Sequence, residues 1–117
     1  MKNNEEFKSY MSLNHLIVNQ VKKIGVLRAN ALGDFIVILP ALYAIRSTYP
    51  EAEIVLLGKP WHKEFLLPGR TPVNRVIIVP IKKGIRNENN RTENEQEICA
   101  FIKLMQQEQF DIVLNFQ

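Results

Sequence analysis

The sequence is poor in the residue types on which several classes of protein depend. It has one cysteine in 117 residues, which excludes an internal disulfide and a cysteine zinc site. Two histidines add too few ligands for a structural metal centre, and five glycines with six prolines exclude collagen-like and low-complexity chains. No apolar run approaches the roughly 20 residues of a membrane-spanning helix. The near-absence of cysteine indicates a reducing, hence cytoplasmic, compartment.

The sequence also has only a small excess of positive over negative charge. Fifteen Lys and Arg against 12 Asp and Glu give a net charge of +3, and the basic residues are scattered along the chain. Nucleic-acid-binding proteins usually cluster basic residues on one face and interleave them with aromatics. The charge pattern therefore favours an anionic small molecule or a phospholipid-like partner over a nucleic acid. The length and the 46% apolar fraction suit one domain.

Apolar patterning divides the chain into a leader over residues 1–21, partly helical or disordered, and a domain over 22–117. Short apolar runs predict four buried strands, at 24–27, 53–58, 73–80 and 110–116. Helical spacing predicts helices over 35–49 and 92–109, the second opened by a capping box at Thr92 and Glu95, and residues 61–67 are expected to form a short helix or a turn. Pro40 is expected to kink the first helix or to mark its start, and Cys99 is expected to be buried.

Alternating strands and helices predict an α/β, Rossmann-like fold with a parallel sheet of strand order 3-2-1-4, covered on both faces. In such a sheet the ligand crevice lies at the carboxyl ends of strands 1 and 4, where the winding reverses direction. Gly33 and Asp34 follow the first strand, and Asn115 and Gln117 end the fourth. The topology therefore directs attention to these four residues.

Several familiar motifs are missing: a G-x-G-x-x-G turn, a Walker A sequence and a G-x-S-x-G elbow. What stands out is the segment 28–46, where a Leu-Gly-Asp turn leads into a helix with Leu-Pro-Ala-Leu. With YPEAEIVLL at 49–57, PVNRVI at 72–77 and FDIVLNFQ at 110–117, it resembles glycosyltransferase family 9. That family contains the ADP-heptose:lipopolysaccharide heptosyltransferases, and the similarity runs from about residue 22 to 117.

The resemblance implies a GT-B enzyme, in which two Rossmann-like domains face each other. This chain would be the N-terminal, acceptor-side half, truncated after the fourth strand and inactive alone. The nucleotide-sugar donor, ADP-heptose, would be held by the missing C-terminal domain. The acceptor would be an anionic lipid-linked saccharide of the lipopolysaccharide core, reached at the inner face of the cytoplasmic membrane by peripheral contact. Transfer would proceed with inversion, without a cofactor or an obligatory metal, and without nucleic acid as a partner.

Asp34 has two interpretations: a helix N-cap, or, by the resemblance, the general base that deprotonates the acceptor hydroxyl. The remaining expected substrate-binding residues lie after strands 1, 3 and 4: Arg28, Leu32, Gly33, Lys82, Lys83, Arg86 and Gln117. The basic loop residues are alternatively a solvated surface, since nearby glutamates neutralise them. Trp61 is expected to pack on the sheet, the alternative being that it stacks on a sugar beside the crevice. His62 is not expected to be a catalytic base. For the whole chain, the alternative is a non-catalytic Rossmann-like binding or interaction module, or a gene remnant.

Overall fold

A computed structural model describes residues 20–29, 32–66, 69, 71–88 and 91–117, except for the side chains of residues 32–35 and 65. Its four strands are β1 (Lys23–Leu27), β2 (Glu53–Gly58), β3 (Arg75–Ile78) and β4 (Ile112–Asn115). They form one parallel sheet in the order β3-β2-β1-β4, which confirms the predicted α/β fold and topology. The predicted leader lies, except for its last two residues, outside the described part of the chain.

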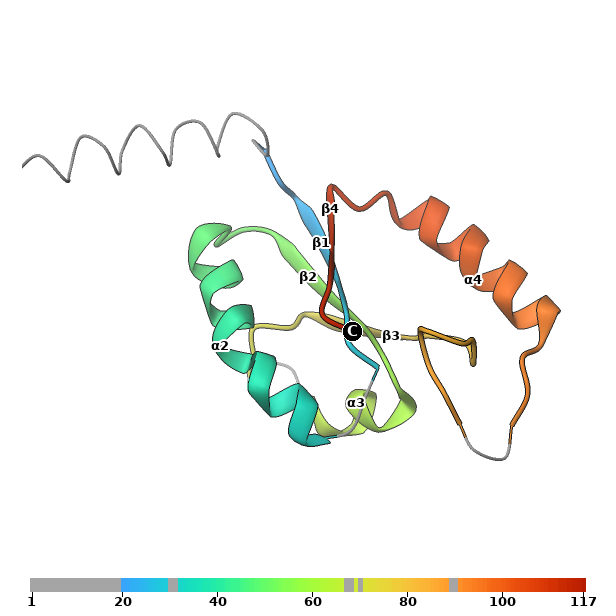
Figure 1. The fold of residues 1–117 in the computed structure, drawn as a ribbon. Helices are drawn as coiled ribbons and strands as arrows, with labels where there is room; N and C mark the ends of the chain where they lie inside the picture. Colours follow the sequence, from blue (N-terminus) through green and yellow to red (C-terminus); the bar gives the residue numbers. More distant parts are fainter. Residues whose placement is uncertain (1–19, 30–31, 67–68, 70, 89–90) are drawn as a thin grey trace, which may run out of the picture.

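Helices lie on both faces of the sheet (Figure 1). The helices α2 (Leu32–Thr48) and α3 (Pro60–Phe65) cover one face, where a core cluster is built on Ile24, Val26, Ile54 and Leu56. The helix α4 (Glu95–Glu108) covers the other face, where Phe101 and Met105 rest on a smaller cluster. That cluster contains Val55, Leu57, Ile77 and Val79. Because α4 has no buried residue of its own, this second face is the less tightly covered one.

The helix α2 differs from its predicted form in two ways. It begins at Leu32, so Asp34 is its third residue rather than its N-cap. It also runs through Pro40 without interruption, so that residue does not mark the start of the helix. A proline φ suits the helix, and the ring removes only the bond to the carbonyl of Ile36. Both residues are exposed, so water can satisfy that carbonyl.

The helix α4 is capped two residues later than predicted. Asn94 is the N-cap, and its side-chain oxygen accepts bonds from the backbone N–H of Gln96 at 2.9 Å and of Glu97 at 3.3 Å. Thr92 therefore lies outside the helix. Cys99 is exposed, so the expectation of a buried cysteine is wrong. It occupies a position on α4 that faces away from the sheet, because the helix contacts the sheet through Phe101 and Met105.

A network of ion pairs ties α4 to the amino ends of three strands. The guanidinium of Arg75 donates to both carboxylate oxygens of Glu108 at 2.7 Å and to Glu53 at 2.8 Å. Lys23 donates to Glu108 at 2.9 Å. These cations lower the pKa of Glu108 to about 2, chiefly through the hydrogen bonds from Arg75. The network lies at the edge of the sheet opposite the predicted ligand crevice, so it holds the scaffold rather than the site.

No helix within the described ranges is long and apolar enough to cross a membrane.

Candidate functional site

Gln117 connects three of the segments in which site residues were predicted. Its side-chain oxygen accepts the backbone N–H of Ala29 at 2.9 Å, and its side-chain nitrogen donates to the carbonyl of Ile85 at 2.5 Å. The turn after β1, the end of β4 and the loop after β3 thus meet at the carboxyl edge of the sheet. The topology predicts this meeting, because the carboxyl ends of parallel strands share one edge.

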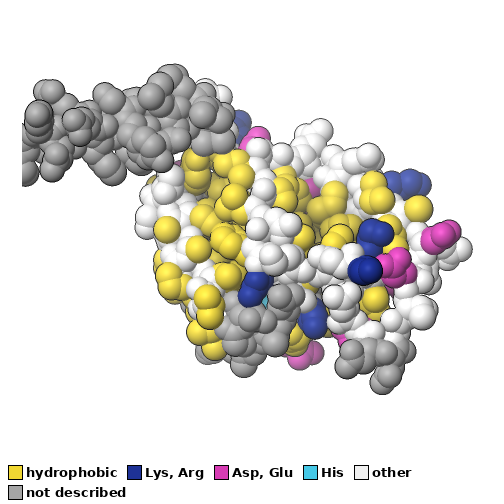
Figure 2. All heavy atoms as spheres, viewed as in Figure 1, with side chains coloured by type: hydrophobic (Ala, Val, Ile, Leu, Met, Phe, Trp, Pro, Cys, Tyr) yellow, Lys and Arg dark blue, Asp and Glu magenta, His cyan; other side chains and the backbone are white. Residues whose placement is uncertain are grey.

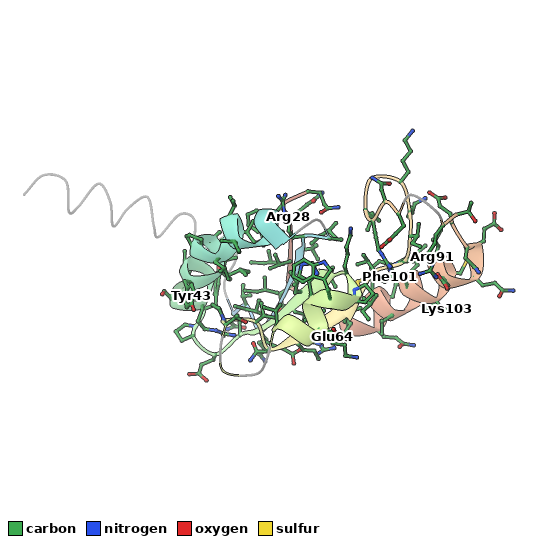
Figure 3. All side chains as sticks on the ribbon, turned by 90° about the horizontal axis from the view of Figure 1, so that it is seen from below. Arg28, Tyr43, Glu64, Arg91, Phe101 and Lys103 are labelled. Atoms are coloured by element: carbon green, nitrogen blue, oxygen red, sulfur yellow. The ribbon has the colours of Figure 1, made fainter. Side chains whose placement is uncertain are left out.

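Arg28 lies at the same edge and reaches across the sheet. Its backbone N–H donates to the carbonyl of Leu57 at 3.1 Å, and its guanidinium donates to the carbonyl of Phe116. The side chain is half-buried near the start of α2, whereas Arg91 lies beside α4 (Figure 3). Arg28 therefore fixes the ends of β2 and β4 relative to β1. A contact with an anionic substrate stays a prediction.

Leu32, Gly33 and Asp34 form the first turn of α2, three to five residues after the anchored Ala29. Their side chains, and Asn30 as a whole, lie outside what the structure describes. The first turn of a helix presents N–H groups and a positive dipole end, which stabilise a carboxylate or a bound anion. The backbone of Asp34 therefore lies at the carboxyl edge of the sheet, where Gln117 bonds to the turn after β1 and to the loop after β3.

The predicted basic residues after β3 form a tight turn. The backbones of Lys82 and Arg86 exchange hydrogen bonds at 3.0 and 2.9 Å, around Gly84 with its positive φ of 86°. Arg86 is only 8% exposed, and its guanidinium donates to the carbonyl of Val79 and to Glu88, each at 3.0 Å. This buried arginine therefore stabilises the turn by joining its two sides at Val79 and Glu88. Of the three basic residues named for this turn, Lys83 is the exposed one.

A hollow of about 410 Å³ lies between this turn and α4. Its walls combine apolar groups, such as Pro80 and Phe101, with the charged side chains of Arg91 and Glu97. Arg91 and Phe101 lie together beside α4 in Figure 3. An apolar wall with charged groups at the rim suits a sugar ring, which has one apolar face and hydroxyl groups at its edge.

A larger hollow, of about 570 Å³, lies at the opposite, amino edge of the sheet. It is lined by Arg46, whose guanidinium is held by the carbonyls of Ala52 at 2.5 Å and Pro72 at 2.9 Å. The same guanidinium donates to Asn74 at 2.5 Å. A cation that is already surrounded by acceptors of its own chain has little to offer an anion. We therefore place the candidate site at the carboxyl edge.

His62 is buried. Its Nδ1 accepts the backbone N–H of Lys59 at 2.8 Å, and its ring stacks on Trp61 with centroids 3.7 Å apart. Burial lowers the pKa of His62 to about 4, so the ring is neutral near pH 7. Gly58 makes room for it, because a Cβ there would lie 2.7 Å from Nδ1.

The sequence did not predict the hydrogen bonds by which Arg28 and Arg86 stabilise the carboxyl edge of the sheet. The sequence pattern does not reveal the bond from Arg86 to Val79, because this partner, just after β3, is a backbone carbonyl. The bridging role of Gln117 was visible only as its position at the end of the fourth strand. Within the described ranges, no cluster of three or more His, Cys, Asp or Glu side chains could hold a metal ion.

Comparison with known proteins assigns this chain to no family. No family model, no curated protein and no solved structure matches this chain. What stands is an α/β chain with a four-stranded parallel sheet of order 3-2-1-4 that alternates with helices, a Rossmann-like topology.

Proposed function

We propose that this chain is the acceptor-side half of an inverting glycosyltransferase of the heptosyltransferase type. It would transfer a sugar from a nucleotide-sugar such as ADP-heptose to an anionic lipid-linked saccharide of the lipopolysaccharide core. The observation that carries the proposal is the bridge from Gln117 to Ala29 and Ile85, which joins three predicted site segments at one edge. The resemblance of the sequence to glycosyltransferase family 9 supplies the chemistry.

In the proposed reaction Asp34 is the general base. The proton of the acceptor hydroxyl passes to the Asp34 carboxylate while the hydroxyl oxygen bonds to the anomeric carbon of the donor. The bond from that carbon to the diphosphate breaks, and ADP leaves with the electron pair. A position in the first turn of α2 favours the ionised carboxylate that this step requires. No cofactor takes part, and the groups that stabilise the departing diphosphate would belong to a donor domain.

The acceptor would lie along the carboxyl edge, between the first turn of α2 and the turn that carries Lys83. The exposed cations Lys83 and Arg91 would meet its phosphates or acid sugars, and the hollow beside α4 would take a sugar ring. Arg86 and Arg28 would act by holding the two sides of this surface in place. The enzyme would work in the cytoplasm, at the inner face of the membrane that holds the lipid-linked acceptor.

The test uses ¹⁵N-labelled chain and two ligands, a deacylated inner-core oligosaccharide with acid sugars and ADP. We expect the oligosaccharide to shift the amide resonances of Ala29, Ile85 and Gln117, and ADP to give no micromolar binding. Lys83→Ala should weaken oligosaccharide binding, whereas Lys63→Ala, at an exposed lysine on α3, is the matched control and should leave it unchanged. Micromolar binding of ADP without the oligosaccharide would contradict the proposal. Binding of neither ligand would favour a non-catalytic interaction module.

A further inference from the structure

The basic turn after β3 is tied to the segment before α4 by the carboxylate of Glu93. Its Oε1 accepts the backbone N–H of Lys83 at 2.8 Å, across ten residues of the chain. Three other N–H groups of the turn are bonded within it, those of Lys82, Ile85 and Arg86. The contact with Glu93 therefore fixes where the tip of the turn lies relative to α4.

Glu93 has a fixed place because it immediately precedes the N-cap of α4. The side chain of Asn94 accepts the N–H groups of Gln96 and Glu97 and so sets the path of the chain at the start of the helix. At the other end of α4, Glu108 is anchored to the strands by its ion pairs. Glu93 thus connects the turn to a helix that is held at both ends.

The charges around the turn are of both signs. Residues 82–97 contain four basic and four acidic side chains. On the face shown in Figure 2, basic and acidic side chains lie next to one another over α4 and the loop before it. Such a surface has no strong net field, so an anion is held by the placement of single cations. A carboxylate beside Lys83 weakens the attraction for an anion, and a role in geometry would compensate for that cost.

We infer that Glu93 is a positioning residue for the anionic acceptor, an inference that rests on the proposed function. There, Lys83 and Arg91 meet the acidic groups of the acceptor. Arg91 lies two residues before Glu93 and lines the same hollow as Arg86 of the turn. The bond from Lys83 to Glu93 therefore sets the spacing of the two cations before the acceptor arrives. A spacing that is already set removes part of the ordering cost of binding.

Two substitutions separate the geometry that Glu93 provides from its charge. Glu93→Gln keeps an oxygen that can accept the Lys83 N–H but removes the negative charge, whereas Glu93→Ala removes both. We expect Glu93→Gln to bind the deacylated inner-core oligosaccharide about two- to fivefold more tightly than the wild-type chain. Glu93→Ala should bind it at least about threefold more weakly than Glu93→Gln, because the tip of the turn is released.

The matched control is the same pair of substitutions at Glu95, an exposed residue of the first turn of α4. Glu95→Gln and Glu95→Ala should bind the oligosaccharide equally. Hydrogen exchange of the Lys83 amide gives a second readout without ligand. It should be slower in Glu93→Gln than in Glu93→Ala and alike in the two Glu95 variants. Thermal melts should stay close to that of the wild-type chain, since both replaced side chains are exposed.

The outcomes distinguish this inference from the proposed function. If the wild-type chain binds the oligosaccharide but the two Glu93 variants bind it equally, the inference is wrong and the proposed function stands. Tighter binding by Glu93→Ala than by Glu93→Gln would also overturn the inference, because Glu93 would then compete with the ligand for the Lys83 N–H. Absence of oligosaccharide binding by the wild-type chain would contradict both.

Discussion

Acidification should destabilise this protein through the buried imidazole of His62. The ring is 0% exposed, and burial lowers its pKa from 6.5 to about 4. In the folded chain it therefore stays neutral at a pH at which the unfolded chain binds a proton. The stability that this group contributes is complete above pH 6.5 and is lost progressively as the pH falls toward 4.

The two pKa values set the size of the effect. Over the full range the loss amounts to about 3 kcal/mol, and between pH 7.5 and 5.0 it is about 2 kcal/mol. The carboxylates whose pKa is lowered titrate outside this interval. Glu53, Glu108 and Asp111 all have pKa values below their ordinary 3.8 to 4.5, so their contributions are lost only at lower pH.

The assay is urea unfolding at several pH values, followed by the fluorescence of Trp61. It is the only tryptophan and stacks on His62, so its signal reports the region in question. His62→Gln is the matched control, because its side-chain oxygen can accept the Lys59 N–H but does not titrate. We expect the wild-type free energy of unfolding to fall by about 2 kcal/mol between pH 7.5 and 5.0 and that of the variant to stay nearly level. Equal slopes in both proteins would refute the reasoning.

Two further substitutions test local packing. Gly58→Ala puts a Cβ 2.7 Å from the His62 ring and should cost about 1–3 kcal/mol of stability, and much less in a His62→Ala background, as a double-mutant cycle of urea midpoints would show. Equal costs in both backgrounds would count against a steric cause. Asn74→Ala removes the acceptor of the buried Ile54 N–H at 2.8 Å and of Arg46, and should cost about 1–2 kcal/mol. Asn74→Asp keeps that acceptor, so a melt of Asn74→Asp as low as that of Asn74→Ala would contradict this explanation.

The sheet could be predicted from the sequence because its signals are local and mutually consistent. The runs at 24–27 and 53–58 are largely buried, and a helix between consecutive parallel strands fixes a right-handed crossover. The order 3-2-1-4 is one of the common orders of such doubly wound sheets. The strand β2 matches its predicted bounds of 53–58. β3 and β4 are shorter than predicted, since the apolar runs continue past the paired residues into the turns.

The boundaries of the helices were harder to predict, because neighbouring residues offer competing signals. Thr92 and Asn94 are both good N-caps, and only the path of the chain decides that Asn94 is used. Pro40 is a helix breaker in general, but it lies on the exposed side of α2, where a lost backbone bond can be replaced by water.

The candidate site was predictable in its location and not in its internal contacts. The winding of the sheet directs Gln117 and the first turn of α2 to one edge, and both lie there. The contacts of Arg28 with Phe116, 88 residues away, and of Arg86 with Val79 go to backbone carbonyls. Such partners carry no side-chain signature, so a pattern of residue types cannot reveal them.

The most direct test of the proposed glycosyltransferase is the turnover of Asp34→Asn. It is measured on a protein that contains both this chain and a donor domain, so that sugar transfer can be assayed. Asn preserves the shape of the side chain but removes the basic carboxylate. If Asp34 is the general base, turnover should fall by about 100-fold or more while binding of the donor and the thermal melt stay nearly unchanged. Near-wild-type turnover from a folded Asp34→Asn protein would contradict the account and leave Asp34 with a structural role at the start of α2.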